Sequence, residues 1–227
     1  MSFLRNNKLY QYEKTTLLTI HCSLFTASAQ NQKIDSLLNE LKKFDAKKLE
    51  HNKNQLPEEE DTTKVNLLNA LSYESYKTGD FAQEMTYAND ALTLAKKLQW
   101  KKGIAYSLKN IGSAYEDVGN YAPALENYFA ALKIFEEIGD KKGIASSYNN
   151  IGAVYFRQSN YPEALKNYFA SLKIKEEIGD KNGIAASYNN IGNIYLRQDN
   201  YPEALKNHFA ALKILEEMGD KYGIGAS

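Results

Sequence analysis

The chain of 227 residues has little cysteine, little proline and no excess of charge. Its only cysteine, Cys22, excludes an internal disulfide framework and a cysteine-based zinc cluster. The 28 lysines and arginines balance 28 aspartates and glutamates, so we expect no nucleic-acid partner. Only 4 prolines accompany 17 tyrosines, a composition typical of a packed helical protein and unlike a disordered chain.

The sequence also lacks the short motifs of common catalytic sites. It contains no P-loop, no H-E-x-x-H zinc motif and no G-x-S-x-G nucleophile motif. The three histidines, His21, His51 and His208, lie in unrelated sequence contexts. We therefore predict a protein that is not an enzyme and that needs no metal and no organic cofactor.

The N-terminal segment resembles an export signal more than part of a fold. A loosely basic start precedes the apolar stretch TTLLTIHCSLF, which is too short for a membrane span of about 20 residues. Ala27-Ser28-Ala29 then supplies the small-x-small pattern that signal peptidase requires. We expect residues 1–29 to be a signal peptide cleaved before Gln30, which places the chain in the periplasm or outside the cell. The alternative is an uncleaved N-terminus in the cytoplasm.

A forty-residue repeat organises the rest of the chain. Residues 144–183 and 184–223 are identical at 30 of 40 aligned positions, and residues 104–143 are clearly related to both. The expected divisions are an N-terminal helix and polar linker at 30–63, four repeats at 64–103, 104–143, 144–183 and 184–223, and a truncated fifth repeat that starts at 224.

Each repeat is predicted to form two helices. In the third repeat, Tyr148, Ile151 and Tyr155 recur at helical spacing on one face. Asn160 or Ser159 is expected to cap the second helix at its start. A glycine after the second helix and an aspartate before the next one, as in Gly179-Asp180, are expected to cap the helices on either side of the turn.

A glycine inside the first helix needs its own explanation, because glycine costs about 1 kcal/mol there relative to alanine. Gly152 is expected to face Ala164 of the second helix, so that the two helices cross closely. Tyr148 and Tyr155 would fill the space on either side of this crossing.

These positions resemble the signature of the tetratricopeptide repeat. The third repeat supplies its members as Tyr148, Ile151, Gly152, Tyr155, Ala164, Tyr168 and Ser171. The first repeat departs most, with Leu68, Leu71, Ser72, Ser75, Glu84, Ala88 and Ala91 at these positions. The forty-residue period is similar to that of kinesin light chains, of Leu-Gly-Asn-rich G-protein signalling modulators and of bacterial sensor regions. The resemblance implies an all-α, right-handed superhelical solenoid of tandem helix-turn-helix repeats.

The resemblance also implies that the first helix of each repeat lines a concave groove for a peptide. The groove positions map to Lys109, Asn110, Ser113, Asn149, Asn150, Phe156, Arg157, Asn189, Asn190, Asn193, Leu196 and Arg197. Asparagine amides donate and accept together, so they can bind the backbone of a peptide whatever its side chains. The alternative is that one asparagine of each pair bonds a neighbouring helix. Arg157 and Arg197 are expected to recognise carboxylates.

The expected function is a protein–protein interaction scaffold that binds a peptide or partner helix in the groove. One alternative is that these residues form the N-terminal sensor or interaction region of a longer signalling protein, a cyclase or histidine kinase truncated at residue 227. Another is a self-associating module whose solenoid ends stack. Chaperone-tail binding is not favoured, because Ala186 stands where the carboxylate-clamp pattern requires lysine. The N-terminal helix is expected either to cap the first repeat or to occupy the groove.

Overall fold

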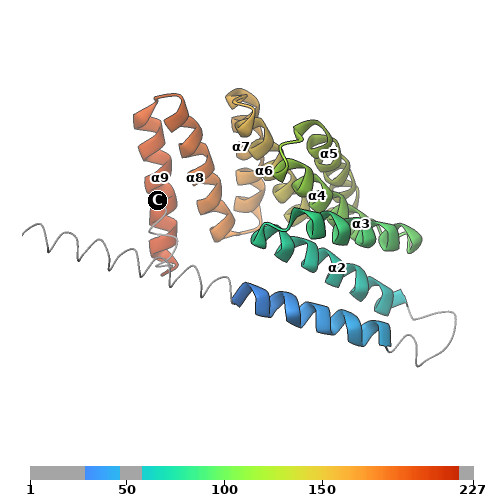
Figure 1. Cartoon of the computed structure of the whole chain (residues 1–227). Coiled ribbons are helices and arrows are strands. Elements are labelled where there is room, and N and C mark those ends of the chain that lie inside the picture. The colour runs from blue at the N-terminus through green and yellow to red at the C-terminus, as the bar shows by residue number, and fades with distance from the viewer. Residues whose placement is uncertain (1–28, 47–57, 220–227) are drawn as a thin grey trace, which may run out of the picture.

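The computed structural model describes residues 29–46 and 58–219, and within these residues the chain is helical with no strand. Residues 29–46 form the first helix (Figure 1). The helices that follow are α2 (Glu58–Thr78), α3 (Phe81–Lys97), α4 (Lys101–Asp117), α5 (Tyr121–Ile138), α6 (Lys141–Arg157), α7 (Tyr161–Glu177), α8 (Lys181–Arg197) and α9 (Tyr201–Glu217). Residues 1–28 of the predicted signal peptide at 1–29, and the fifth repeat from 224, lie outside the described residues.

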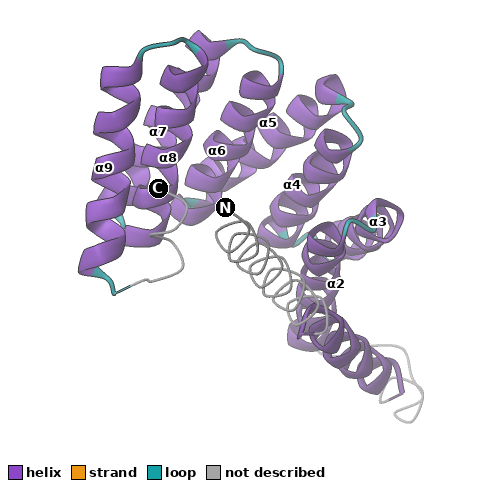
Figure 2. Ribbon diagram, turned by 60° about the vertical axis from the view of Figure 1, so that its left-hand side comes forward, coloured by secondary structure: helices purple, strands orange, loops and turns teal. Residues whose placement is uncertain are grey.

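The helices form consecutive antiparallel pairs, α2–α3, α4–α5, α6–α7 and α8–α9, which we call units one to four. Figure 2 shows the pairs following one another in an arc, with α2–α3 at one end and α8–α9 at the other. The fold is therefore the all-α, right-handed superhelical solenoid that the sequence predicts. No helix of the described part of the chain is long and apolar enough to cross a membrane.

The predicted helix ends are confirmed at both ends of α7 and at the start of α8. The Asp180 carboxylate accepts a hydrogen bond from the backbone N–H of Gly183 at 3.0 Å and so begins α8. Asn160, not Ser159, caps α7, since its side chain accepts from the backbone N–H of Glu163. Ser159 instead adopts a left-handed φ of 59° in the turn before it, while Gly179 adopts a φ of 70° after α7.

The interior glycines make room for aromatic rings. A Cβ added to Gly152 would lie 2.9 Å from the ring of Tyr168 and 3.3 Å from the carbonyl oxygen of Ala164. The glycine therefore faces Ala164 as predicted, but the closest atoms belong to Tyr168. Gly112 lies in the same way against Tyr128 in unit two. The sequence-based prediction placed Tyr148 and Tyr155 beside the crossing and did not include Tyr168, whose ring leaves no room for a side chain at Gly152.

Two hydrophobic clusters have buried residues from two neighbouring units. Ala124, Tyr128 and Leu132 of α5 pack with Ile151 and Val154 of α6. The same arrangement recurs one unit later between α7 and α8. Because each second helix packs on the first helix of the next unit, the core runs without interruption along the solenoid.

The helix of residues 29–46 covers α2. Leu41 packs against the apolar cluster of unit one, and Lys64 of α2 lies 2.5 Å from the Asp45 carboxylate. Lys33 contributes an ion pair at 2.7 Å to Glu74, which holds the position of Val154 in unit three. Since Val154 packs against the preceding second helix, residues 29–46 take the place of such a helix in front of unit one. Figure 1 shows the two helices running side by side.

Candidate functional site

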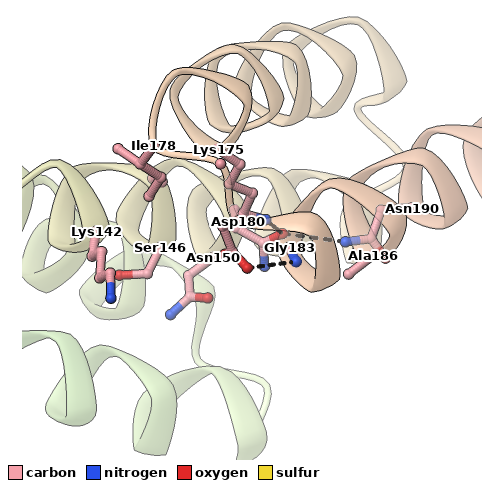
Figure 3. Close-up of a pocket in the computed structure, with 12 residues that line it drawn as sticks. Lys142, Ser146, Asn150, Lys175, Ile178, Asp180, Gly183, Ala186 and Asn190 are labelled. Carbon is pink, nitrogen blue, oxygen red and sulfur yellow. Dashed lines mark hydrogen bonds between the residues drawn. The ribbon is translucent and has the colours of Figure 1, made fainter. Parts of the chain in front are cut away.

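The predicted groove face contains a pocket of about 580 Å³ between α6, α7 and α8. Figure 3 shows Asn150 of α6, Lys175 of α7 and Asn190 of α8 around it. The lining residues are Lys142, Ala145, Ser146, Asn149, Asn150, Lys175, Ile178, Gly179, Asp180, Gly183, Ala186 and Asn190. The structure thus brings three of the predicted site residues, Asn149, Asn150 and Asn190, to one pocket.

Several of the predicted groove asparagines bond within the protein. The Asn110 side chain donates to the backbone oxygen of Asn69 at 3.1 Å and to its side-chain oxygen at 3.2 Å. The Asn190 side chain donates to Asn149 Oδ1 at 3.3 Å. Both bonds join residues 41 positions apart and tie the first helices of neighbouring units together. Asn110 therefore bonds a neighbouring helix, which is the alternative to ligand binding given above, because its amide is buried and hydrogen-bonded to Asn69.

Asn150 is the exception. It is half-buried at the pocket, and its amide has no hydrogen-bond partner among residues 29–46 and 58–219. Asn189, the equivalent of Asn149 in unit four, lies with its Oδ1 3.1 Å from Nδ1 of His208. Among the predicted asparagines that line the pocket, Asn150 thus keeps both a donor and an acceptor for a ligand.

Arg157 is already paired. Its Nε lies 3.0 Å from Oε1 of Glu116 in unit two, and the other oxygen of that carboxylate accepts from the Tyr128 hydroxyl at 2.9 Å. A ligand carboxylate would therefore have to compete with Glu116 for the Arg157 guanidinium, which the sequence-based prediction did not include. The residue at the corresponding position for Arg197 is Phe156 of unit three, and Arg197 forms no ion pair within the described residues.

The other predicted residues differ in environment. Lys109 is half-buried with its ammonium 5.3 Å from the ring centre of Tyr106, and burial lowers the pKa of this lysine while Asp140 opposes the shift. Phe156 packs with the cluster between units three and four. Asn193 is exposed. Ser113 hydrogen-bonds the buried carboxyl group of Glu84 and so faces α3.

Glu84 is a buried acid in unit one. Burial, followed by the nearby charge of Asp117, raises the pKa of Glu84 to about 8, so its carboxyl group is largely protonated at neutral pH. The other units place Ala124, Ala164 and Ala204 at this position. The sequence showed the substitution, but its consequence depends on burial next to a second carboxylate.

Lys175 was missed by the sequence analysis. It lies on the buried face of α7 with 8% of its surface exposed, and Nζ donates to Ser187 Oγ at 2.9 Å and to Asn149 Oδ1 at 3.5 Å. The corresponding residues in the neighbouring units are Phe135 and Leu215. A charged residue in an apolar stripe was the available signal. No group of three or more metal-ligating side chains occurs in the part of the chain that the structure describes.

Comparison with known families identifies the repeat. A family model described as tetratricopeptide repeat matches residues 103–177 and again residues 143–217, together about half of the chain. No curated protein matches the chain significantly.

Solved structures share the fold at low sequence identity. Aspartyl phosphate phosphatase F from Bacillus subtilis is 18% identical, with a TM-score of 0.71 over 86% of this chain and 51% of that one. A Rap protein in complex with competence and sporulation factor is 19% identical, with a TM-score of 0.70 over 85% and 52%. BtubC from P. vanneervenii is 16% identical, with a TM-score of 0.63 over 76% and 70%. The chain thus spans about half the length of the first two.

Proposed function

Because the chain belongs to the tetratricopeptide repeat family, we propose that it is a non-catalytic protein-interaction scaffold that binds a peptide or partner helix in the groove of α4, α6 and α8. The observation that carries this proposal is the amide of Asn150, which lines the pocket without a partner among the described residues. Asn149 and Asn190 beside it are already joined to each other. A pre-aligned pair next to a free amide favours binding over a purely structural role.

The chemistry of these amides suits a peptide backbone. A primary amide offers a donor and an acceptor, which match the C=O and N–H of an extended or helical segment. The neighbouring pair limits the movement of Asn149 and Asn190, so less side-chain entropy is lost when a ligand binds. The Rap structure with competence and sporulation factor supports the proposal, as it shows a related fold holding a ligand.

The test compares two asparagines. The full chain is used to select binders from a random nonapeptide library, and the best peptide is measured against Asn150→Ala and Asn89→Ala. Asn89 is an exposed asparagine of α3 that bonds only its own helix. Loss of the Asn150 amide should weaken binding about five- to tenfold with little change in melting, since one hydrogen bond contributes about 1 kcal/mol. Equal affinity of both variants would overturn the groove assignment, and a large drop in the melting temperature of Asn150→Ala would assign this amide to structure.

We further propose export, because residues 1–29 have the pattern of a cleaved signal peptide. N-terminal sequencing of the protein from its native source should then begin at Gln30. An intact Met1 on protein recovered from cytoplasmic extract supports the alternative location.

A second candidate function is the sensor or interaction region of a longer signalling protein. One structural neighbour, a signal transduction ATPase with a tetratricopeptide repeat sensor from Pyrococcus horikoshii, matches over 85% of this chain but only 30% of its own length, at 17% identity and a TM-score of 0.64. Sequencing the gene past codon 227 distinguishes the two proposals, because a cyclase or kinase domain downstream favours the sensor.

End-to-end self-association is a third possibility with an observation of its own. Tyr201, Leu205 and Phe209 of α9 are more than half exposed, and the described residues do not cover them. The equivalent Tyr161 and Leu165 pack against the next unit. Size-exclusion chromatography over a range of concentrations tests association, which should be lost in Leu205→Glu if this face mediates it.

A further inference from the structure

Lys175 places a positive charge where the repeat normally places an apolar side chain. Phe135 fills this position in unit two and is fully buried, and Leu215 fills it in unit four. Lys175 is itself more than nine-tenths buried. Since an apolar residue satisfies the packing in the neighbouring units, packing alone does not account for a lysine.

The ammonium group of Lys175 lacks a negative partner. Its hydrogen bonds go to the neutral oxygens of Ser187 and Asn149, and no carboxylate of the described residues lies within ion-pairing distance. Burial lowers the pKa of Lys175, and the charge of Asp180 opposes this effect only in part. A buried cation with neutral partners is costly unless a counter-ion is supplied.

The pocket beside Lys175 is lined by side chains that can bind an anionic counter-ion. Lys142 lines its rim, is exposed, and forms no ion pair with any residue that the structure describes. Asn150 and Ser146 add uncharged polar groups. Asp180 is the one acid in the lining, and its carboxylate is engaged by the backbone N–H of Gly183. Figure 3 shows the Lys175 side chain extending from α7 toward Asp180.

We propose that this pocket binds a carboxylate of the peptide ligand, with Lys175 as the buried cation and Lys142 and Asn150 as its partners at the rim. This inference rests on the proposed peptide-binding function and names the group that the pocket selects. The carboxylate belongs either to an aspartate or glutamate side chain or to the C-terminus of the peptide, because both present the same two oxygens.

The test uses the selected nonapeptides in forms that differ only in charge. One form carries its acidic side chain and an amidated C-terminus, a second carries the matching amide side chain and a free C-terminus, and a third has neither carboxylate. Binding of each is measured to the full-length wild-type chain, to Lys175→Met and to Lys173→Met. Lys173 is an exposed lysine of the same helix, so it controls for loss of a charge. Methionine fits an apolar position, and Lys175→Met is expected to melt at or above the wild-type temperature.

The wild-type chain should bind one carboxylate form at least about tenfold more tightly than the neutral form, and Lys175→Met should lose this preference while Lys173→Met keeps it. The preferred form identifies the source of the carboxylate. Selected peptides without any carboxylate preference, or a preference that survives in Lys175→Met, contradict this inference but leave groove binding intact. If the wild-type chain selects no peptide at all, the proposed function fails and this inference fails with it.

Discussion

Units one and three form the same kind of helix pair, but the side chains where the two helices cross differ. In unit three, Gly152 lies against the ring of Tyr168 next to the small Ala164. In unit one the equivalent residues are Ser72, Ala88 and Glu84. The Ser72 hydroxyl and one oxygen of Glu84 are buried without a hydrogen-bond partner among the described residues.

This difference shows that the two helices of a unit cross in the same way when a small residue, Gly152 or Ser72, lies at the crossing. The crossing does not depend on one particular set of side chains around that residue. It also has an energetic consequence. The ring-on-glycine centre of unit three is insensitive to pH, whereas the buried carboxyl group of unit one makes the stability of the N-terminal end depend on pH. The first unit is therefore expected to be the weak part of the solenoid at alkaline pH.

The largest expected effect concerns Glu84. Its pKa rises from an ordinary value of 4.5 to about 8 in the folded chain. Because the folded pKa lies above the unfolded one, the contribution of Glu84 to the free energy of unfolding is fully present below pH 4.5. This contribution, on the order of 4 kcal/mol, is lost as the pH rises through 8. Urea unfolding between pH 4.5 and 9 should show a smaller loss of stability in Glu84→Ala than in the wild-type chain. The exposed Glu126 of α5 is the control, and Glu126→Ala should keep the wild-type dependence.

Substitution of Gly152 should have the next largest effect. Gly152→Leu brings side-chain atoms into the space of the Tyr168 ring and should reduce the free energy of unfolding by about 3 kcal/mol, although leucine favours the helix. Ser72→Ala at the equivalent position of unit one should be neutral or stabilising, because it removes a buried hydroxyl without a partner. Circular dichroism during urea unfolding measures both, and a higher midpoint for Gly152→Leu would contradict the packing explanation.

The smallest expected effect is at the turns within the units. Unit one uses Gly79 with a φ of 74°, whereas unit three holds Ser159 at a φ of 59°. Ser159→Gly should stabilise the chain by about 0.5–1 kcal/mol, because glycine adopts a left-handed conformation without steric cost. Thermal melting detects this shift. An unchanged or lower melting temperature would mean that the entropy glycine adds to the unfolded chain offsets the gain.

Much of the fold could be predicted from the sequence because the determining features are local. The repeat period, the helical spacing of Tyr148 and Ile151, and the cap at Asp180 depend only on neighbouring residues in the chain. The ring over Gly152 was not predicted, since several aromatic residues share the correct periodicity and only the crossing of two helices selects Tyr168.

The candidate site was less predictable for the same reason. Asn110 and Asn150 occupy equivalent positions in their units. Asn110 donates a hydrogen bond to Asn69, the residue 41 positions earlier in the preceding unit. The residue 41 positions before Asn150 is Lys109. Arg157 and Arg197 likewise differ only through Glu116, which has no counterpart beside Arg197. These distinctions depend on residues 41 positions apart, and a single repeat does not reveal them.

The most direct test of peptide binding in the groove follows the side-chain amide resonances of the full chain while a selected peptide is added. Binding in the groove should cause saturable shifts for the amides of Asn150 and Asn190 and none for the amide of Asn89 on helix α3. Shifts confined to Asn89 and other amides of the second helices, with Asn150 unchanged, would contradict it.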